Sequence, residues 1–394
     1  MLKSIFNCKS NHGFSYQIYN SFIDVDLKVW DRLNTKNNIY LSSSYLSALE
    51  LGMKDKMNFR YLLFFNSDNN AVGIAVFQIV NFSPKDLLQE RIPCSIADSI
   101  QSYFLNDKNL SLLICGNLYA CGENGSSHDS NISEEDFYGI LVEAIADFQN
   151  SKINGSKISF SLIKEIWQES KEPIKLLEKA SFLDFNIDVN MILNIREKWK
   201  NFDLYLEDMN TKYRTRAKGV FKKSKDIVQR SLTLVELESR LDRIDILYKQ
   251  VLDKADYNLG VLQARTFLEL KKKLGNDFVF NGYFIDEKLV GFTSCFLYKD
   301  ILDANFVGID YEYNNSYKLY QRMLYDFVSC AIQNNKTEVR LGRTAETSKS
   351  GVGAIPVEMK LFAKHRNLLP SKLLKPLTSS IKPKTFELRK PFKN

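Results

Sequence analysis

The sequence has few histidines and no closely spaced cysteines. Its three histidines are His12, His128 and His365, and its six cysteines are scattered without a Cys-x-x-Cys pair. A metal centre built on imidazole needs several histidines, and a zinc site or a disulfide framework needs cysteines at short spacing. The composition therefore favours metal-free chemistry in a reducing compartment, and we expect a cytoplasmic protein.

Long apolar runs are also missing. No stretch approaches the ~18 residues of a membrane helix, and Lys3, Asn7 and Lys9 interrupt the N-terminus, which argues against a signal peptide. The chain is rich in core-forming residues, with 44% hydrophobic residues, 27 Phe and 19 Tyr. Because a single core tends to divide beyond about 250–300 residues, the length of 394 residues predicts two domains.

The same order of elements is predicted twice along the chain. In the first half, strand-like runs at 59–65 and 71–80 flank a polar turn, a third run follows at 110–115, and Ser133 begins an amphipathic helix. The second half repeats this order. Its strand-like runs are 278–285, 289–298, 301–309 and 338–341, and an amphipathic helix is predicted between the last two. The repetition suggests a duplicated α/β fold joined near residues 185–200.

Positive charge is concentrated in two segments. The formal net charge is +7, yet residues 212–230 hold eight Lys or Arg against Asp226, and residues 364–394 hold nine against Glu387. An anionic partner would explain the first segment: tRNA phosphates, the phosphates of coenzyme A or of an acyl carrier, or a phospholipid surface. A solvated helix face is the alternative.

The first basic segment has the spacing of an amphipathic helix. Its apolar and small residues recur at steps of three and four and predict an inward face: Tyr213, Ala217, Val220, Phe221, Ser224 and Val228. The outward stripe is then basic, with like charges four residues apart that repel one another: Arg214, Lys218, Lys222 and Lys225.

The second basic segment contains four of the eight prolines, which break long helices. We therefore expect residues 367–394 to form a basic, Pro-rich tail. It would be either unstructured and solubilising or in reversible, peripheral contact with nucleic acid or with the anionic inner face of a membrane.

Short motifs occur along both halves of the chain: Asn210–Lys218, Asp310–Leu324, Leu341–Pro356, and Gly116-Asn117 with Gly122–Gly125. With them, most of residues 20–366 resembles the FemABX-like branch of the GNAT superfamily. The resemblance implies an α/β (α+β) fold of two tandem GNAT-like domains, each a mixed, mostly antiparallel sheet flanked by helices, with no metal. It also implies transfer of an acyl or aminoacyl group from an activated carboxyl donor to an amine.

From this resemblance we expect an N-terminal GNAT-like domain at 1–190 and a C-terminal one at 191–366 that carries the main site. The function would be transfer to an amine of an envelope precursor or amino lipid, with acyl-CoA, a carrier protein or aminoacyl-tRNA as donor substrate and no resident cofactor. A catalytically silent GNAT-like module that docks RNA or an anionic membrane through its basic helix is the alternative.

One departure from the GNAT pattern concerns the donor. Enzymes of this superfamily that use acetyl-CoA bind its pyrophosphate with a glycine-containing loop between the fourth strand and the next helix. The corresponding segment here, Asp310–Lys318, has no glycine after Gly308 and begins with two acids, Asp310 and Glu312. The sequence thus favours aminoacyl-tRNA or a carrier-bound donor over acetyl-CoA.

Candidate catalytic residues lie in the second half. Alternation in the run 301–309 places Asp303 and Asn305 on one face, where Asp303 would be a general base for the amine. Arg343 follows a strand end and would hold a phosphate or carboxylate, or else form a structural salt bridge with Glu346. The other candidates for substrate or donor binding are Lys349, in a loop expected to be flexible, and, from the basic helix, Lys212, Arg214, Arg216, Lys218 and Lys222.

Three weaker candidates complete the set. Tyr317 and Tyr320 could donate a proton, although Tyr320 lies on an apolar helical stripe and is expected in the core. In the first half, Gly122–Gly125 near His128 is a further candidate.

Overall fold

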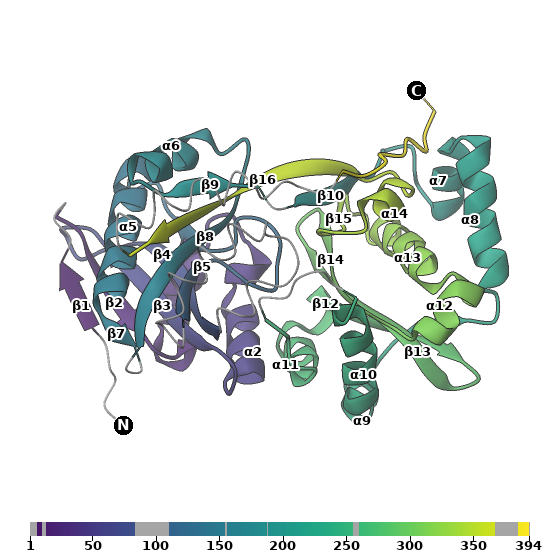
Figure 1. Cartoon of the computed structure of the whole chain (residues 1–394), viewed down its shortest axis with the longest axis horizontal. Helices are drawn as coiled ribbons and strands as arrows, with labels where there is room; N and C mark the ends of the chain where they lie inside the picture. Colours follow the sequence, from purple (N-terminus) through teal and green to yellow (C-terminus); the bar gives the residue numbers. More distant parts are fainter. Residues whose placement is uncertain are drawn as a thin grey trace, which may run out of the picture. The chain divides into compact units, whose positions relative to one another are not determined.

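A computed structural model describes residues 6–9, 13–82, 110–153, 156–186, 188–254, 260–366 and 385–393. Its contacts divide the chain into two compact units (Figure 1). The described residues of the first unit lie within 6–50, 54–188 and 358–366, and those of the second within 51–53, 189–357 and 385–393.

These limits differ from the predicted ones at the C-terminal side. The division at 188/189 is close to the predicted boundary, but residues 358–366 belong to the first unit. They do so because strand β16 (Ile355–His365) pairs antiparallel with two strands of that unit, β8 and β9. Residues 385–393, expected in a separate tail, pack within the second unit.

The first unit is a mostly antiparallel sheet with the strand order β1-β2-β3-β4-β5-β8-β16. Its one parallel pair among the described strands is β5–β8, and helix α5 lies between these strands in the chain, as a parallel connection requires. The elements are β1 Phe6–Lys9, β2 Ser15–Tyr19, α1 Leu27–Leu33, α2 Ser43–Met53, β3 Asn58–Phe65, β4 Ala71–Phe82, β5 Leu110–Cys115, β6 Ser126–His128, α5 Glu134–Asn150, β7 Lys152–Ile153, β8 Ser156–Trp167, α6 Lys171–Lys179 and β9 Leu183–Phe185.

The second unit repeats this plan with the strand order β10-β15-β14-β13-β12-β11. Its parallel pair among the described strands is β14–β15, again separated in the chain by helices. The elements are β10 Val189–Asn194, α7 Phe202–Asp208, α8 Thr211–Lys223, β11 Val228–Ser231, α9 Leu234–Ser239, α10 Leu241–Leu252, α11 Arg265–Leu274, β12 Phe278–Ile285, β13 Lys288–Tyr298, β14 Ile301–Ile309, α12 Tyr311–Tyr317, α13 Leu319–Gln333, β15 Glu338–Arg340 and α14 Glu346–Ser350.

The predicted fold class and the main strands are confirmed. The runs predicted at 278–285 and 301–309 coincide with β12 and β14, and the run at 110–115 coincides with β5. Ser133 caps α5 as predicted, since its side chain accepts a hydrogen bond from the Asp136 amide. Runs of apolar residues bounded by polar turns, together with a helix cap, make these elements readable from sequence.

The predicted basic helix is too long. Helix α8 ends at Lys223, where the Ser224 hydroxyl bonds to the Val220 carbonyl of the last turn, and the chain continues into strand β11. Val228, predicted on the inward face, lies in β11 and is 60% exposed. The three- and four-residue spacing of apolar positions continues past Lys223, although the helix itself ends there.

The core of the second unit sits between α13 and one face of the sheet. Met191 of β10, Leu302 of β14 and Val339 of β15 pack there with Val328 of α13, all essentially inaccessible to solvent. Burial of each such side chain contributes roughly 1.5–3 kcal/mol relative to exposure. Helix α8 adds Val220 to the same cluster, which fixes α8 beside α13 (Figure 1).

None of the helices in the described part of the chain is both long enough and apolar enough to cross a bilayer.

Candidate functional site

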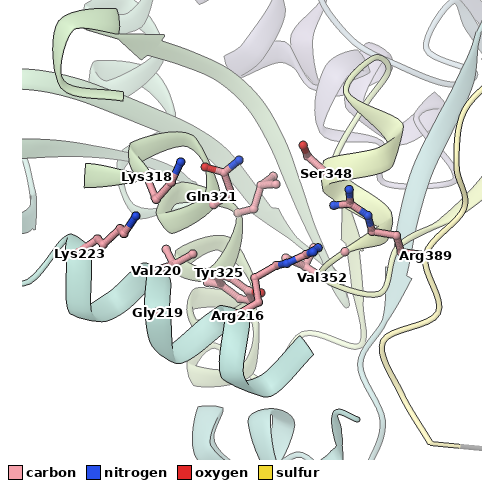
Figure 2. A pocket seen from close by; sticks show the side chains of 12 residues that line it. Arg216, Gly219, Val220, Lys223, Lys318, Gln321, Tyr325, Ser348, Val352 and Arg389 are labelled. Carbon is pink, nitrogen blue, oxygen red and sulfur yellow. The ribbon is translucent and has the colours of Figure 1, made fainter. Parts of the chain in front are cut away.

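The second unit contains a cavity of about 380 Å³, within the range of roughly 300–1,000 Å³ that small-molecule sites occupy. It lies among α8, the first half of α13, α14 and the C-terminal residues of the chain (Figure 2). Its lining residues are Arg216, Gly219, Val220, Lys223, Lys318, Gln321, Leu324, Tyr325, Ser348, Gly351, Val352 and Arg389.

Four of the lining side chains are cationic, and none is acidic. Arg216 and Lys223 come from α8, Lys318 from the junction of α12 and α13, and Arg389 from the C-terminal segment. Among the described residues, neither Lys223 nor Lys318 forms an ion pair. Cations gathered around a partly apolar hollow repel one another, so an anionic ligand would stabilise the arrangement.

Helix periodicity explains how α8 presents two cations to one cavity. Arg216, Gly219 and Lys223 follow at steps of three and four, so they lie on one face of the helix. Gly219 leaves that face open, since a Cβ built there meets no atom within 4 Å. Figure 2 shows Arg216 extending from α8 toward the side of the cavity that carries Arg389.

The first turn of α13 forms the opposite wall. Lys318 adopts a left-handed conformation (φ 55°) that separates α12 from α13, and Lys318 and Gln321 both line the cavity. The amide groups at a helix N-terminus carry a partial positive charge that favours anions. The helix end thus adds to the positive potential of the side chains.

The floor is apolar apart from one hydroxyl. Val220, Leu324 and Val352 line it together with Tyr325, which is 3% exposed. Burial raises the pKa of the Tyr325 hydroxyl to about 12, against the opposing influence of the Arg216 and Arg389 guanidinium groups. The hydroxyl therefore stays protonated at neutral pH and can donate a hydrogen bond to a ligand oxygen.

The segment after β14 is the one that was expected to lack a pyrophosphate-binding loop. The carboxylate of its first residue, Asp310, occupies the N-terminus of the helix that follows. Asp310 caps α12 by accepting a hydrogen bond from the Glu312 amide, and it is 4% exposed. Its other oxygen lies 2.6 Å from Arg243 Nη2 and 3.7 Å from Lys288 Nζ. A carboxylate of the chain itself thus caps the N-terminus of α12.

The predicted catalytic pair lies on β14, away from the cavity lining. Leu302 and Ala304 face the α13 side, so alternation places Asp303 on the opposite face. Asp303 is 3% exposed, opposes Arg340 of β15 in register, and interacts electrostatically with Arg340 and Tyr298. Its role as a base stays a prediction.

Asn305 lies at an irregularity of β14. The β13–β14 register shifts between Thr293 and Cys295, and the Ser294 hydroxyl accepts a hydrogen bond from the Phe306 amide at 3.1 Å. Pairing between β14 and β15 also ends just before Asn305, at Asp303. Such bulges often re-aim a side chain beside an active site.

The predicted anion-binding residues after β15 lie close together but outside the cavity lining. Arg343 is half-buried, and its carbonyl accepts a hydrogen bond from Lys349 Nζ. Lys349 is 5% exposed and belongs to α14, so it is part of a helix rather than of the expected loop. Glu346 begins α14 and acts electrostatically on Tyr320.

Of the five basic-helix residues predicted to bind the donor, the structure places only Arg216 in the cavity lining. Arg214 is half-buried and donates to the Glu207 carbonyl, whereas the remaining three are exposed elsewhere on α8: Lys212, Lys218 and Lys222. Tyr320 lies against the core of α13, as expected, and Tyr317 is half-buried in α12.

The first-unit candidate, Gly122–Gly125, lies in a loop held by hydrogen bonds, and its role stays a prediction. Glu123 accepts a hydrogen bond from the Trp167 amide at 2.8 Å, and the Gly122 amide donates to Glu165 at 2.7 Å. Glu165 in turn pairs with Lys164 at 2.6 Å, and both side chains are at most 3% exposed. His128 lies in β6 with its ring 4.7 Å from that of Phe137. These contacts tie the loop that follows β5 to the end of β8.

Sequence reasoning did not predict most of the cavity. Lys318 and Arg389 lie far from α8 in the chain, and no local pattern marks Lys318 as left-handed because it is not a glycine. Lys223 was counted in the basic segment but not assigned to a site. A usable signal was the pair Arg216 and Lys223 on one helical face with Gly219 between them.

Proteins similar to this chain were found only by comparison with solved structures. No family model and no curated protein matches the sequence. FemX resembles it with a TM-score of 0.55 and 10% identity, over 90% of this chain and 98% of FemX. L-PGS from Bacillus licheniformis has a TM-score of 0.50 and 11% identity, over 90% and 96% of the two chains.

A tandem GNAT protein from the clavulanic acid biosynthesis pathway is similar to the same extent, with a TM-score of 0.50 and 9% identity over 90% of this chain and 99% of that one. At such identities the likeness concerns the fold alone. Together with the repeated sheet order of the two units, it identifies the fold of this chain as a tandem GNAT-like fold of the FemX type.

Proposed function

We propose that the protein is an N-acyl- or aminoacyltransferase that binds the phosphate-bearing part of an activated donor in the cavity of its second unit. The observation that carries the proposal is the cavity lining, in which four cations converge without an acid. The acceptor is an amine of an envelope precursor or an amino lipid, and the protein works in the cytoplasm.

Phosphate is the anion that this lining suits best. Arg216 and Arg389 offer planar forks for two oxygens each, and Lys223 and Lys318 supply point charges. The Tyr325 hydroxyl and the first turn of α13 add neutral donors. Charge-assisted hydrogen bonds of this kind contribute about 1.5–3 kcal/mol each, enough to hold a donor at micromolar concentration.

In this proposal, the reacting carbonyl group of the donor lies beside the point where β14 and β15 cease to pair. Ligands of open α/β sheets bind beyond the carboxyl ends of such neighbouring parallel strands. Asn305 lies within β14, just beyond its last residue paired with β15, and Arg343 follows the end of β15. The predicted base Asp303 takes a proton from the ammonium, and the free amine nitrogen attacks the donor carbonyl. The C–N bond forms as the ester or thioester bond breaks, and the leaving oxygen or sulfur takes up the second proton that the nitrogen loses.

Acetyl-CoA is not the donor we propose. The buried Asp310 carboxylate already accepts the hydrogen bond at the start of α12, and it would repel a pyrophosphate placed there. FemX and L-PGS share the fold, and a lysylphosphatidylglycerol synthetase is named among the similar structures. The name lysylphosphatidylglycerol joins an aminoacyl group to a phospholipid, which agrees with an aminoacyl donor and a lipid acceptor.

The test compares two variants of α8 that each remove two cations. Arg216→Ala/Lys223→Ala empties one wall of the cavity, whereas Lys218→Ala/Lys222→Ala changes only exposed positions of the same helix. Binding of aminoacyl-tRNA, acylated carrier protein and acetyl-CoA is measured for each at two salt concentrations, together with transfer to an amine. We expect the first variant to lose at least tenfold in donor affinity and the second to keep it.

Other outcomes point elsewhere. Equal losses in both variants, without transfer in the wild type, would favour the silent docking module that uses the whole basic face of α8. Low-micromolar affinity for acetyl-CoA would overturn the donor assignment. Asp303→Asn should abolish transfer while donor affinity remains, and unchanged transfer would remove Asp303 from the mechanism.

A further inference from the structure

The C-terminal residues 385–393, here called the C-terminal strap, lie across the second unit beside the cavity (Figure 1). Arg389 is the one strap residue in the cavity lining. Its neighbour Lys390 is exposed and does not line the cavity. The strap therefore points a single cation toward the ligand space (Figure 2).

The backbone of the strap forms hydrogen bonds with the rest of the second unit on both sides of Arg389. On one side, Ser350 at the end of α14 accepts a hydrogen bond from the Arg389 amide at 3.1 Å and donates to the Glu387 carbonyl at 3.5 Å. On the other side, the amide of Asn210 donates to the Pro391 carbonyl at 2.8 Å, and its side chain donates to the Phe392 carbonyl at 3.1 Å. Asn210 is also the residue that precedes α8.

Phe392 is the anchor of the strap. Its ring centroid lies 4.7 Å from that of Trp199, and the Arg196 guanidinium lies 4.8 Å from the same ring. Gly353 makes room for it, since a Cβ at that position would come within 2.2 Å of the ring. The anchor site is thus shaped for an aromatic side chain at this one position of the strap.

The strap touches the two elements that form the cavity walls. Asn210 directly precedes α8, which carries Arg216 and Lys223. Ser350 is the last residue of α14, and the nearby residues Ser348 and Gly351 line the cavity. A docked strap therefore joins α8 to α14 and closes the ring of four cations. An undocked strap would leave the site with three cations and an open side.

We infer that the C-terminal strap is part of the anion site: Arg389 binds a ligand phosphate, Phe392 is the positioning residue that holds Arg389 there, and ligand binding and strap docking stabilise each other. The inference rests on the proposed function, because it concerns the same cavity. Linkage requires that whatever docking adds to ligand affinity, the ligand adds to docking.

The experiment uses the full chain and inorganic pyrophosphate as probe, with affinity measured by calorimetry. We expect Arg389→Ala and Phe392→Ala each to weaken binding about tenfold, and the double variant to bind no more weakly than Arg389→Ala by itself. Such non-additivity identifies two residues that act through one contact. Lys390→Ala is the matched control, and it should bind as the wild type does.

A second measurement reads the strap itself. Hydrogen exchange of peptides that cover 385–393 and the Asn210 amide should slow on addition of pyrophosphate, and Arg389→Ala should abolish the slowing. Failure of the wild type to bind pyrophosphate would remove the cavity as a phosphate site. Wild-type binding with unchanged affinity in Arg389→Ala, or additive losses in the double variant, would overturn the role of the strap alone.

Discussion

The two units have the same strand order, but the segment that follows the first strand of the parallel pair has a different role in each. In each, a parallel pair of strands is connected through a long helix, α5 in the first unit and α13 in the second. After β5 of the first unit, the loop is tied down by buried hydrogen bonds to Glu165 and Lys164. After β14 of the second unit, the chain turns directly into helices whose junction lines a cationic cavity.

The comparison separates polar residues that stabilise the fold by pairing with each other from polar residues that are available to bind a ligand. In the first unit, Lys164 and Glu165 pair with each other, and both side chains are nearly inaccessible to solvent. The second unit leaves Lys223 and Lys318 without an acid among the described residues. A duplicated fold can thus keep one unit as scaffold and one as binding site.

The largest effect is expected at Lys164. Lys164→Met leaves the Glu165 carboxylate buried without its cation, and breaking such a pair costs about 3–5 kcal/mol of unfolding free energy. Urea unfolding measures the loss. Lys164→Met/Glu165→Gln should recover part of it, because the amide carries no charge and still accepts from the Gly122 amide.

Two controls sharpen this prediction. Lys175→Met breaks an exposed pair with Glu172 of the same unit and should change stability very little. Pyrophosphate affinity of folded Lys164→Met should equal that of the wild type. A loss of affinity there would show that the two units do not divide their roles as proposed.

A smaller effect is expected at Lys318, where charge and backbone can be separated. Asn tolerates the left-handed conformation that Lys318 adopts, so Lys318→Asn removes the cation and keeps the helix junction. We expect pyrophosphate affinity to fall about tenfold, equivalent to ~1.4 kcal/mol, with little change in melting temperature.

The matched control is another left-handed lysine of the same unit. Lys299 has φ 47° and lies outside the cavity lining. Lys299→Asn should leave affinity unchanged. Equal losses in both variants would mean that overall charge, rather than the position of Lys318, governs binding.

The sequence was sufficient for the fold but only partly for the site. Strands such as β12 and β14 are readable because short apolar runs and the turn residues that bound them are local signals. The cavity is assembled from α8, α13, α14 and the strap, and no local pattern links Arg216 to Arg389. The basic tail was visible as charge and proline content, but its docking depends on the space left by Gly353, a contact between distant residues.

The smallest effect concerns Gly219, the open position on the cavity face of α8. A glycine inside a helix is less stable than alanine by about 0.5–1 kcal/mol, and a Cβ at Gly219 would meet no atom within 4 Å. Gly219→Ala should therefore raise the free energy of unfolding by that amount and leave pyrophosphate affinity unchanged.

Gly219→Trp tests the same position in the opposite sense. The large ring would occupy the space between α8 and α13, so we expect it to abolish pyrophosphate binding while the chain stays folded, as circular dichroism would show. Gly139 of α5 provides the counterpart in the first unit, because a Cβ there also meets nothing within 4 Å. Gly139→Trp should leave binding intact, and if it blocked pyrophosphate as well, the assignment of the anion site to the second unit would be wrong.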